Sequence, residues 1–197
     1  MFSNKDLRKI IIPLVIEQLL AVTIGMADTV MVSSCGEAAV SGISLVDSIN
    51  FLLITLFSSL ATGGAVIASQ YIGRGDHKSA SLAAKQLFYA SLALSAVLGV
   101  IAVFFRKPVL NMVFGSIKAD VMAHAQIYFL LSAISYPFLA VYNAGAALFR
   151  SMGDSRTTML ISILMNTINI VGNAILIYGF QMAAAGAATA SLVSRAV

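Results

Sequence analysis

Charged residues are scarce in this sequence. Only 10% of its 197 residues are charged, whereas 59% are hydrophobic, and the mean hydropathy is +0.94. An ordinary soluble domain carries about 25% charged residues. So few charges cannot cover the surface of a water-soluble protein, and the composition therefore indicates an integral membrane protein.

Cysteine and the residues of common catalytic motifs are also nearly absent. The single cysteine, Cys35, excludes an internal disulfide and a cysteine-rich metal site. His77 falls in a predicted connector and His124 at the end of a predicted span, so a two-histidine metal site has little support. The stretch "ATGGAV" (61–66) lacks the Lys-Ser/Thr pair that completes a phosphate-binding loop. We therefore expect neither enzymatic activity nor a cofactor.

The net charge of +4 does not indicate a nucleic-acid partner, because the basic residues are spread over short connectors. Such a spread is typical of membrane proteins whose loops select the topology. The first 20 residues, "MFSNKDLRKIIIPLVIEQLL", do not form a signal peptide. They run into a full-length apolar span and contain no small-residue cleavage site.

Long apolar runs are abundant. Five complete spans and the start of a sixth are predicted at 10–33, 46–71, 84–105, 122–147, 157–179 and 184–197. Runs of about 20 apolar residues predict transmembrane helices, whereas a membrane β-barrel shows short alternating segments. The sixth run is unfinished at Val197, without the polar flank that normally closes a span. We expect an all-α integral membrane lobe of six helices, the sixth truncated.

The placement of lysine and arginine predicts the orientation. Eight basic residues lie at the N-terminus and in the second and fourth connectors: Lys5, Arg8, Lys9, Arg74, Lys78, Lys85, Arg150 and Arg156. The opposite side has three: Arg106, Lys107 and Lys118. This asymmetry predicts a cytoplasmic N-terminus. Arg195 fits neither side. It is either a charge on a transport pathway or a sign that the sixth span starts elsewhere, and we favour the second interpretation.

The first predicted span contains an acidic residue far from either end. Asp28 lies about 18 residues into the span, where a charge costs a few kcal/mol and usually marks a pathway for ions or substrates. Glu17 shares its helical face about 16 Å away, nearer the cytoplasmic end. Glu17 is a secondary candidate, or a carboxylate that reaches water or a connector lysine. Pro13 either bends this span or is a first-turn proline.

Three asparagines follow a helical spacing in the fifth predicted span. Asn166, Asn169 and Asn173 stand at i, i+3 and i+7, which places them on one face. They either form hydrogen bonds between helices or, facing Asp28, supply neutral oxygens beside its carboxylate. In the second case the set predicts a site for Na⁺ or for an exchangeable proton.

Four stretches together resemble the multidrug and toxic compound extrusion (MATE) transporters. "MADTVMVSSCGEAAVSGIS" (26–44) resembles the first-span signature of that family, and "GGAVIASQYIGRGD" (63–76) resembles the end of its second span. "LFRSMGDSRTTM" (148–159) resembles its loop before the fifth span. "NTINIVGNAILIYG" (166–179) with "AAAGAATAS" (183–191) resembles its fifth and sixth spans. The matches run in order across nearly the whole chain.

The resemblance implies a fold and a function. MATE proteins have twelve spans in two six-helix lobes that rock about a central cavity. They export cationic and amphipathic compounds against H⁺ or Na⁺. Residues 1–197 would then form the N-terminal lobe of such an antiporter in the plasma membrane. Its partners would be membrane lipid, small cationic substrates and a second lobe.

The resemblance also assigns roles to individual residues. Asp28 matches the coupling aspartate of the first span, and Pro13 matches a proline at which that span bends in some members. Asn169 matches an asparagine of the ion site, while Asn173 falls where some members carry a second aspartate. This difference leaves the choice between H⁺ and Na⁺ open. Thr189 and Ser191 are further candidates, as hydroxyl ligands of the same ion.

Two other functions stay open at this point. A lipid-linked precursor flippase of the same superfamily would line its cavity with basic residues, and here Arg195 is the only intramembrane candidate. A non-transporting lobe, whether an assembly partner, a half-size homodimer or a truncated product, is the other alternative. Alternating access needs a second lobe, so this chain alone should not transport.

Overall fold

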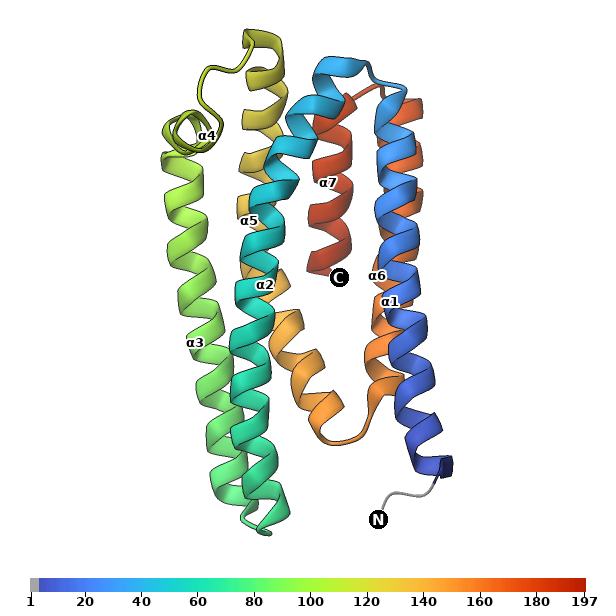
Figure 1. The fold of residues 1–197 in the computed structure, drawn as a ribbon, viewed down its shortest axis with the longest axis vertical. Helices are drawn as coiled ribbons and strands as arrows, with labels where there is room; N and C mark the ends of the chain where they lie inside the picture. The colour runs from blue at the N-terminus through green and yellow to red at the C-terminus, as the bar shows by residue number, and fades with distance from the viewer. Residues whose placement is uncertain (1–3) are drawn as a thin grey trace.

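The computed structural model describes residues 4–197, except for the side chains of residues 4–7, 9, 10, 21 and 24. These residues form helices and short connectors without a strand (Figure 1). The elements are α1 (Asn4–Ser33), α2 (Glu37–Gly73), α3 (His77–Phe104), α4 (Arg106–Phe114), α5 (Ala119–Ser151), α6 (Ser155–Asn173), the π-helix η1 (Ala174–Gly179) and α7 (Ala183–Ala196).

Five of the predicted spans coincide with helices that are long and apolar enough to cross a membrane: Ile11–Ser33, Glu37–Gly73, His77–Phe104, Ala119–Ser151 and Ser155–Gly179. Several helices are longer than the predicted spans because they continue into the polar connectors. The second helix, for example, starts at Glu37 rather than at residue 46. The sixth predicted helix, α7, begins at Ala183, one residue before the predicted start.

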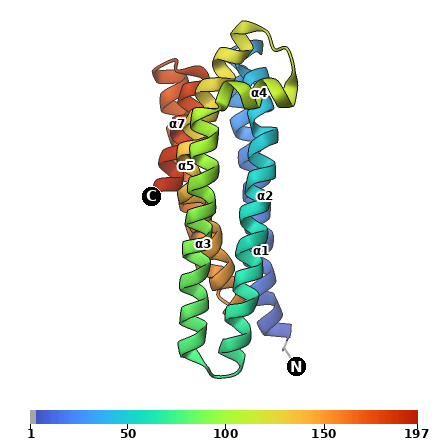
Figure 2. The same ribbon diagram turned by 90° about the vertical axis from the view of Figure 1, so that its left-hand side faces the viewer.

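One helix was not predicted from the sequence. The predicted spans leave residues 106–114 in a connector, but these residues form the short helix α4. Pro108 lies in its first turn, where a missing N–H breaks no helical hydrogen bond. Figure 2 shows α4 lying crosswise over one end of the bundle, between α3 and α5.

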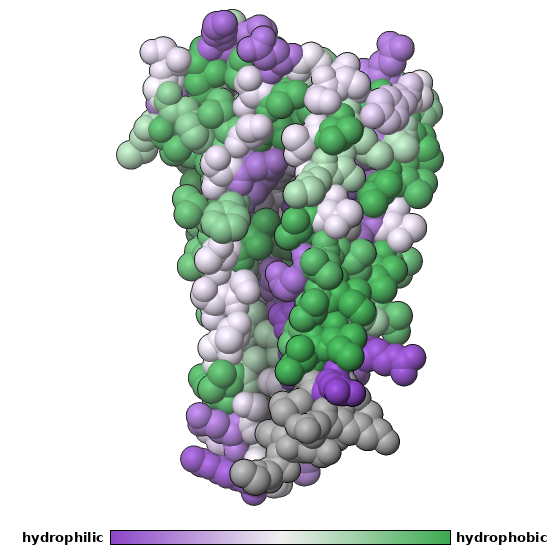
Figure 3. Space-filling model, turned by 45° about the vertical axis from the view of Figure 1, so that its right-hand side comes forward, coloured by the Kyte–Doolittle hydropathy of each residue, from purple (hydrophilic) through white to green (hydrophobic). Residues whose placement is uncertain are grey.

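The bundle has two packed groups of helices. α2, α3 and α5 pack against one another, α1 packs mainly on α6, and α7 contacts both α5 and α6. α1 and α2 contact each other little, so an opening remains between them. Figure 3 shows hydrophilic side chains set back in the hollow between α2 and α1, while the outward sides of α1 are hydrophobic.

Small residues bring α2 and α5 close together. A Cβ on Gly42 of α2 would lie 2.9 Å from the backbone nitrogen of Ala125 and from the oxygen of Val121, both on α5. Such close backbone approaches are how membrane helices pack without a hydrophobic driving force. Farther along α5, Pro137 lies inside the helix, and Figure 1 shows the remainder of α5 turning toward α6. Proline explains this bend because it removes a backbone hydrogen bond.

Two connectors at one end of the bundle share a capping arrangement. Gly75 and Gly153 adopt positive φ values of 75° and 84°, and an aspartate follows each of them. Asp76 accepts a hydrogen bond from the Ser79 nitrogen at the start of α3, and Asp154 accepts one from Thr157 at the start of α6. The sequence motifs "GDHKS" and "GDSRT" are therefore helix N-caps in a glycine turn.

Candidate functional site

Asp28 faces the asparagines of α6 across the bundle. The Asn173 amide nitrogen donates to Asp28 Oδ1 at 2.5 Å, and to Asn169 Oδ1 at 3.2 Å. The Asn169 amide in turn donates to Ser191 Oγ of α7 at 3.1 Å. The structure thus brings Asp28, Asn169, Asn173 and Ser191 into one polar cluster that joins α1, α6 and α7.

Two residues of the predicted set lie outside this cluster. Asn166 donates to Ser162 Oγ one turn away on its own helix, at 3.2 Å. The Thr189 hydroxyl donates to the Ala185 oxygen of its own helix at 2.7 Å. Two helical residues that are two positions apart point about 200° away from each other. Ser191 and Thr189 therefore point to opposite sides of α7, and of the two it is Ser191 that joins the cluster, through Asn169.

The helix changes its hydrogen-bond pattern next to the cluster. The α-helical part of α6 ends at Asn173, and the π-helix η1 begins at Ala174. π-helical turns are rare in proteins as a whole, but those that occur often lie at functional sites. The Asn173 side chain is fully buried, and its oxygen accepts no hydrogen bond from the residues that the structure describes. A buried carbonyl oxygen of this kind is available to a water molecule or a cation.

A hollow of about 170 Å³ opens beside Asp28, between α1, α2, α5 and α7. It contains a second carboxylate, Asp47 of α2, together with Tyr128 and Arg195. Asp47 is not among the residues predicted from the sequence, because position 47 lies at the edge of the predicted span 46–71, where a carboxylate is ordinary. In the structure α2 starts ten residues earlier, so Asp47 lies well inside the helix.

Arg195 belongs to this hollow. Its Nη1 donates to Ser135 Oγ of α5 at 2.7 Å. The interpretation that the sixth span starts elsewhere is wrong, since α7 begins where it was predicted and Arg195 points into the bundle. The other interpretation, a charge on a pathway, fits its position.

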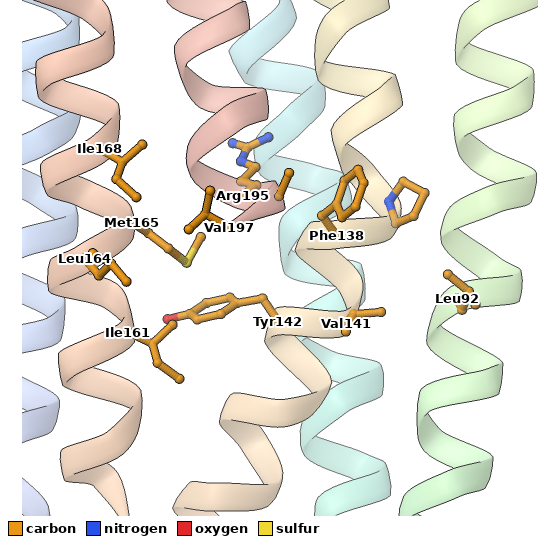
Figure 4. Close-up of a pocket in the computed structure, with 12 residues that line it drawn as sticks. Leu92, Phe138, Val141, Tyr142, Ile161, Leu164, Met165, Ile168, Arg195 and Val197 are labelled. Atoms are coloured by element: carbon orange, nitrogen blue, oxygen red, sulfur yellow. The ribbon is translucent and has the colours of Figure 1, made fainter.

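Arg195 also lines a larger, mostly apolar cavity of about 490 Å³ (Figure 4). Phe138 and Tyr142 of α5 and Met165 and Ile168 of α6 enclose it from two sides. Of the twelve described residues that line it, Arg195 alone carries a charge. Ala196 and Val197 line it as well, so the cavity lies directly beyond the end of α7.

Glu17 forms a separate cluster nearer the N-terminal end of α1. It is buried and accepts from Arg150 Nη1 at 3.1 Å, from Thr158 Oγ1 at 3.3 Å and from Tyr142 Oη at 3.5 Å. Its basic partner is thus an arginine of the predicted fourth connector rather than a lysine, and the structure places this arginine at the end of α5. Pro13 is buried ten residues into the first helix, so the first-turn interpretation is wrong.

A comparison with protein-family models decides the family. The model described as MatE matches residues 13–175, which is most of the chain.

The chain belongs to the MatE family.

Curated MatE relatives match nearly all of this sequence. The uncharacterized transporter YisQ of Bacillus subtilis is 29% identical over 94% of the chain and 41% of its own length. The probable multidrug resistance protein NorM of Thermotoga maritima is 29% identical over 98% of the chain and 42% of its own length. The chain therefore spans about two fifths of the length of these relatives.

Solved MATE structures share the fold. A multidrug resistance MATE transporter in an outward-facing conformation superposes with a TM-score of 0.90 at 23% identity, covering 98% of this chain and 42% of its own. A MOP superfamily transporter from Pyrococcus furiosus superposes with a TM-score of 0.84 at 26% identity, again over 98% and 42%. The chain thus has the fold of a MATE transporter over the matched part, and it is a multi-pass membrane protein.

Proposed function

We propose that this MatE chain forms part of a cation-coupled antiporter, in which Asp28 binds the coupling ion, H⁺ or Na⁺. The observation that carries the proposal is a carboxylate within the membrane whose hydrogen-bond partner is a neutral amide. Among the described side chains, the ion pair within 4.0 Å is that of Arg150 with Glu17, so Asp28 has no basic partner at that distance. A charge at this depth is costly unless a cation neutralises it.

The groups around Asp28 suit a small cation. Asn173 supplies a buried oxygen without a partner among the described residues, and Ser191 supplies a hydroxyl one hydrogen bond beyond Asn169. Na⁺ would find neutral oxygens beside one carboxylate, and a proton would need the carboxylate alone. Occupation of Asp28 by either ion changes the charge that α1 presents to α6 and to the hollow. Such a change can bias the equilibrium between two conformations.

Cationic amphipathic compounds fit as cargo. The hollow holds two carboxylates and one guanidinium, so its formal charge is negative. The printed names of several relatives agree, since NorM is named a probable multidrug resistance protein and MepA of Staphylococcus saprophyticus a multidrug export protein. The lipid-linked flippase is less favoured, because a net negative hollow repels a pyrophosphate.

The orientation and the partner are part of the proposal. Figure 1 shows the start of α1 and the α2–α3 and α5–α6 connectors at the same end of the bundle. The more basic connectors therefore share one end, which supports a cytoplasmic N-terminus in the plasma membrane.

The relatives are more than twice as long as this chain, which supports a second lobe. An intact mass of the native protein near 20.7 kDa, rather than above twice that value, would contradict a second lobe in the same polypeptide.

The coupling role is tested by transport in membrane vesicles that contain the native protein. With an imposed Na⁺ or pH gradient, efflux of the dye ethidium should require Asp28. Asp28→Asn should lower ion-driven efflux by at least about tenfold, since it removes the carboxylate that the coupling ion neutralises. Asp120→Asn, an exposed carboxylate at the start of α5, is the matched control and should leave efflux unchanged. Ion-driven efflux that survives in Asp28→Asn would refute the proposal.

A further inference from the structure

The second carboxylate of the hollow is held in a fixed orientation. Tyr128 of α5 donates to Asp47 Oδ1 at 3.0 Å, and Asn50, one turn farther along α2, donates to the same oxygen at 3.3 Å. Asn50 is itself buried and accepts from the hydroxyl of Tyr136 at 2.8 Å. A network of this kind orients a carboxylate by fixing one of its oxygens.

The other oxygen of Asp47 is left for a ligand. Both hydrogen bonds to Asp47 end on Oδ1, and no described side chain donates to Oδ2. The Asp47 side chain is exposed to the hollow, and the Tyr128 side chain lines the hollow beside it. One free carboxylate oxygen next to an aromatic ring is a poor site for a metal ion, which gathers several oxygen ligands. It suits an organic ammonium or iminium group, which needs one counter-charge and can pack against the tyrosine side chain.

The positive charge of the hollow is held away from Asp47. Arg195 Nη1 is bound to Ser135 Oγ, and no described ion pair within 4.0 Å joins Arg195 to either carboxylate. The hollow therefore keeps two unpaired carboxylates and one tethered cation, which leaves room for a single positive charge on an incoming ligand. A dication would meet the guanidinium as well as the carboxylates.

We propose that Asp47 binds the cationic group of the transported compound, at a subsite separate from the coupling ion on Asp28, and that Arg195 restricts this subsite to monocations. Tyr128 and Asn50 are positioning residues for Asp47. This inference rests on the proposed transport function, and it gives the two carboxylates different tasks.

Binding of a matched pair of dyes to the purified native protein in detergent tests the subsite. Ethidium is a monocation, and its reduced form, dihydroethidium, is neutral and of similar shape. Asp47→Asn should weaken ethidium binding by about tenfold or more while leaving dihydroethidium binding unchanged, because only the charged ligand uses the carboxylate. Glu37→Gln, which removes an exposed carboxylate from the start of the same helix, should change neither affinity.

The positioning residues and Arg195 give independent readouts. Tyr128→Phe should lower the preference for ethidium over dihydroethidium, whereas a merely structural defect would weaken both ligands equally. Arg195→Gln should tighten binding of the dication pentamidine severalfold more than binding of ethidium, because it removes the opposing charge. Pentamidine affinity that does not change in Arg195→Gln would overturn the assignment to Arg195.

The test separates this inference from the proposed coupling. In the wild type, added Na⁺ or a lowered pH should weaken ethidium binding. Asp47→Asn should keep that ion-dependent shift, and Asp28→Asn should lose it. Unchanged ethidium affinity in Asp47→Asn overturns the cargo subsite, whereas an unchanged ion-dependent shift in Asp28→Asn overturns the coupling role. The two failures are therefore distinguishable.

Discussion

At the scale of single residues, the ion pair between Glu17 and Arg150 ties three helices together. Glu17 lies on α1, Arg150 at the end of α5, and Thr158, which also donates to Glu17, on α6. The glutamate is buried, while the arginine side chain is 29% exposed. The partial exposure of the arginine lowers the desolvation cost of the pair, and the loss of one partner would leave a partly buried charge.

Replacement of Glu17 should lower the stability of the purified protein. Glu17→Ala leaves the Arg150 guanidinium without its carboxylate, whereas the Thr158 hydroxyl keeps the Ser155 carbonyl, and it should destabilise the fold by about 1–3 kcal/mol. Glu17→Gln should cost less, because its amide oxygen can still accept from Arg150, although the oxygen that accepts from Thr158 is replaced by an amide nitrogen. The midpoint of thermal unfolding in detergent measures the difference. Equal midpoints for the wild type and Glu17→Ala would show that the pair contributes nothing.

The caps of the polar connectors make stability depend on pH. The side-chain hydrogen bond from the Thr157 hydroxyl, followed by the one from the Thr157 backbone nitrogen, lowers the pKa of Asp154 below its ordinary value of 3.8. A lowered folded-state pKa contributes stability that is complete above the ordinary value. That contribution is lost as the pH falls through the lowered pKa.

Asp154→Ala should therefore reduce the unfolding temperature at neutral pH, and the difference from wild type should shrink as the pH falls below 3.8. Asp154→Asn keeps a capping side chain but has no charge to titrate. Its difference from wild type should be smaller at neutral pH. A deficit of Asp154→Ala that is the same at every pH would contradict this role of the charge.

The sequence predicted part of the site at this scale and missed the rest. Asp28 and the asparagines were found because a carboxylate in an apolar run and a seven-residue spacing are local signals. Asp47 was missed because its meaning depends on where α2 starts and on Tyr128, which is 81 positions away in the sequence. Arg195 was misread for the same reason, since its partner Ser135 lies 60 positions earlier.

At the scale of helices, the contact of α2 with α5 depends on Gly42. A methyl group there would lie 2.9 Å from two backbone atoms of α5, which cannot move aside as a flexible side chain can. Gly63 on the same helix has no atom within 4 Å of the place where its Cβ would stand. The two glycines form a natural pair for comparison, because the same substitution has opposite packing consequences.

Gly42→Ala should destabilise the protein by about 1–3 kcal/mol through the overpacked contact. Gly63→Ala should be neutral or stabilise the helix by up to about 1 kcal/mol, because alanine is the better helix former. Thermal unfolding of the two variants in the same detergent compares them directly. If Gly42→Ala were as stable as Gly63→Ala, the close approach of α2 and α5 would not be a constraint.

The predictability of the helices differs between long and short elements. The five long spans were predicted because about 20 apolar residues form a helix in a membrane whatever lies beside them. The short helix α4 was not predicted, because a proline usually indicates a connector. Proline is tolerated in the first turn of a helix, and Pro108 lies in the first turn of α4. The π-helix η1 could not be predicted either, because a change in hydrogen-bond register leaves no mark on the hydrophobic pattern.

At the scale of the whole molecule, α1 stands apart from α2 and packs on α6, with the hollow between the two groups of helices. Asp28 lies on the α1 side of this hollow and Asp47 on the α2 side. Displacement of α1 relative to α2 would therefore change the distance between the proposed ion site and the proposed cargo subsite. This arrangement gives a physical route by which an ion on Asp28 alters the hold on the cargo.

The release of the coupling ion on binding of cargo tests the central claim most directly. Ethidium is added to the purified native protein in detergent, and the released cation is followed with a pH electrode in weak buffer and with radioactive Na⁺. The wild type should release about one cation for each dye bound, and Asp28→Asn should release none while still binding ethidium. The same release from Asp28→Asn as from the wild type would show that Asp28 does not hold the coupling ion.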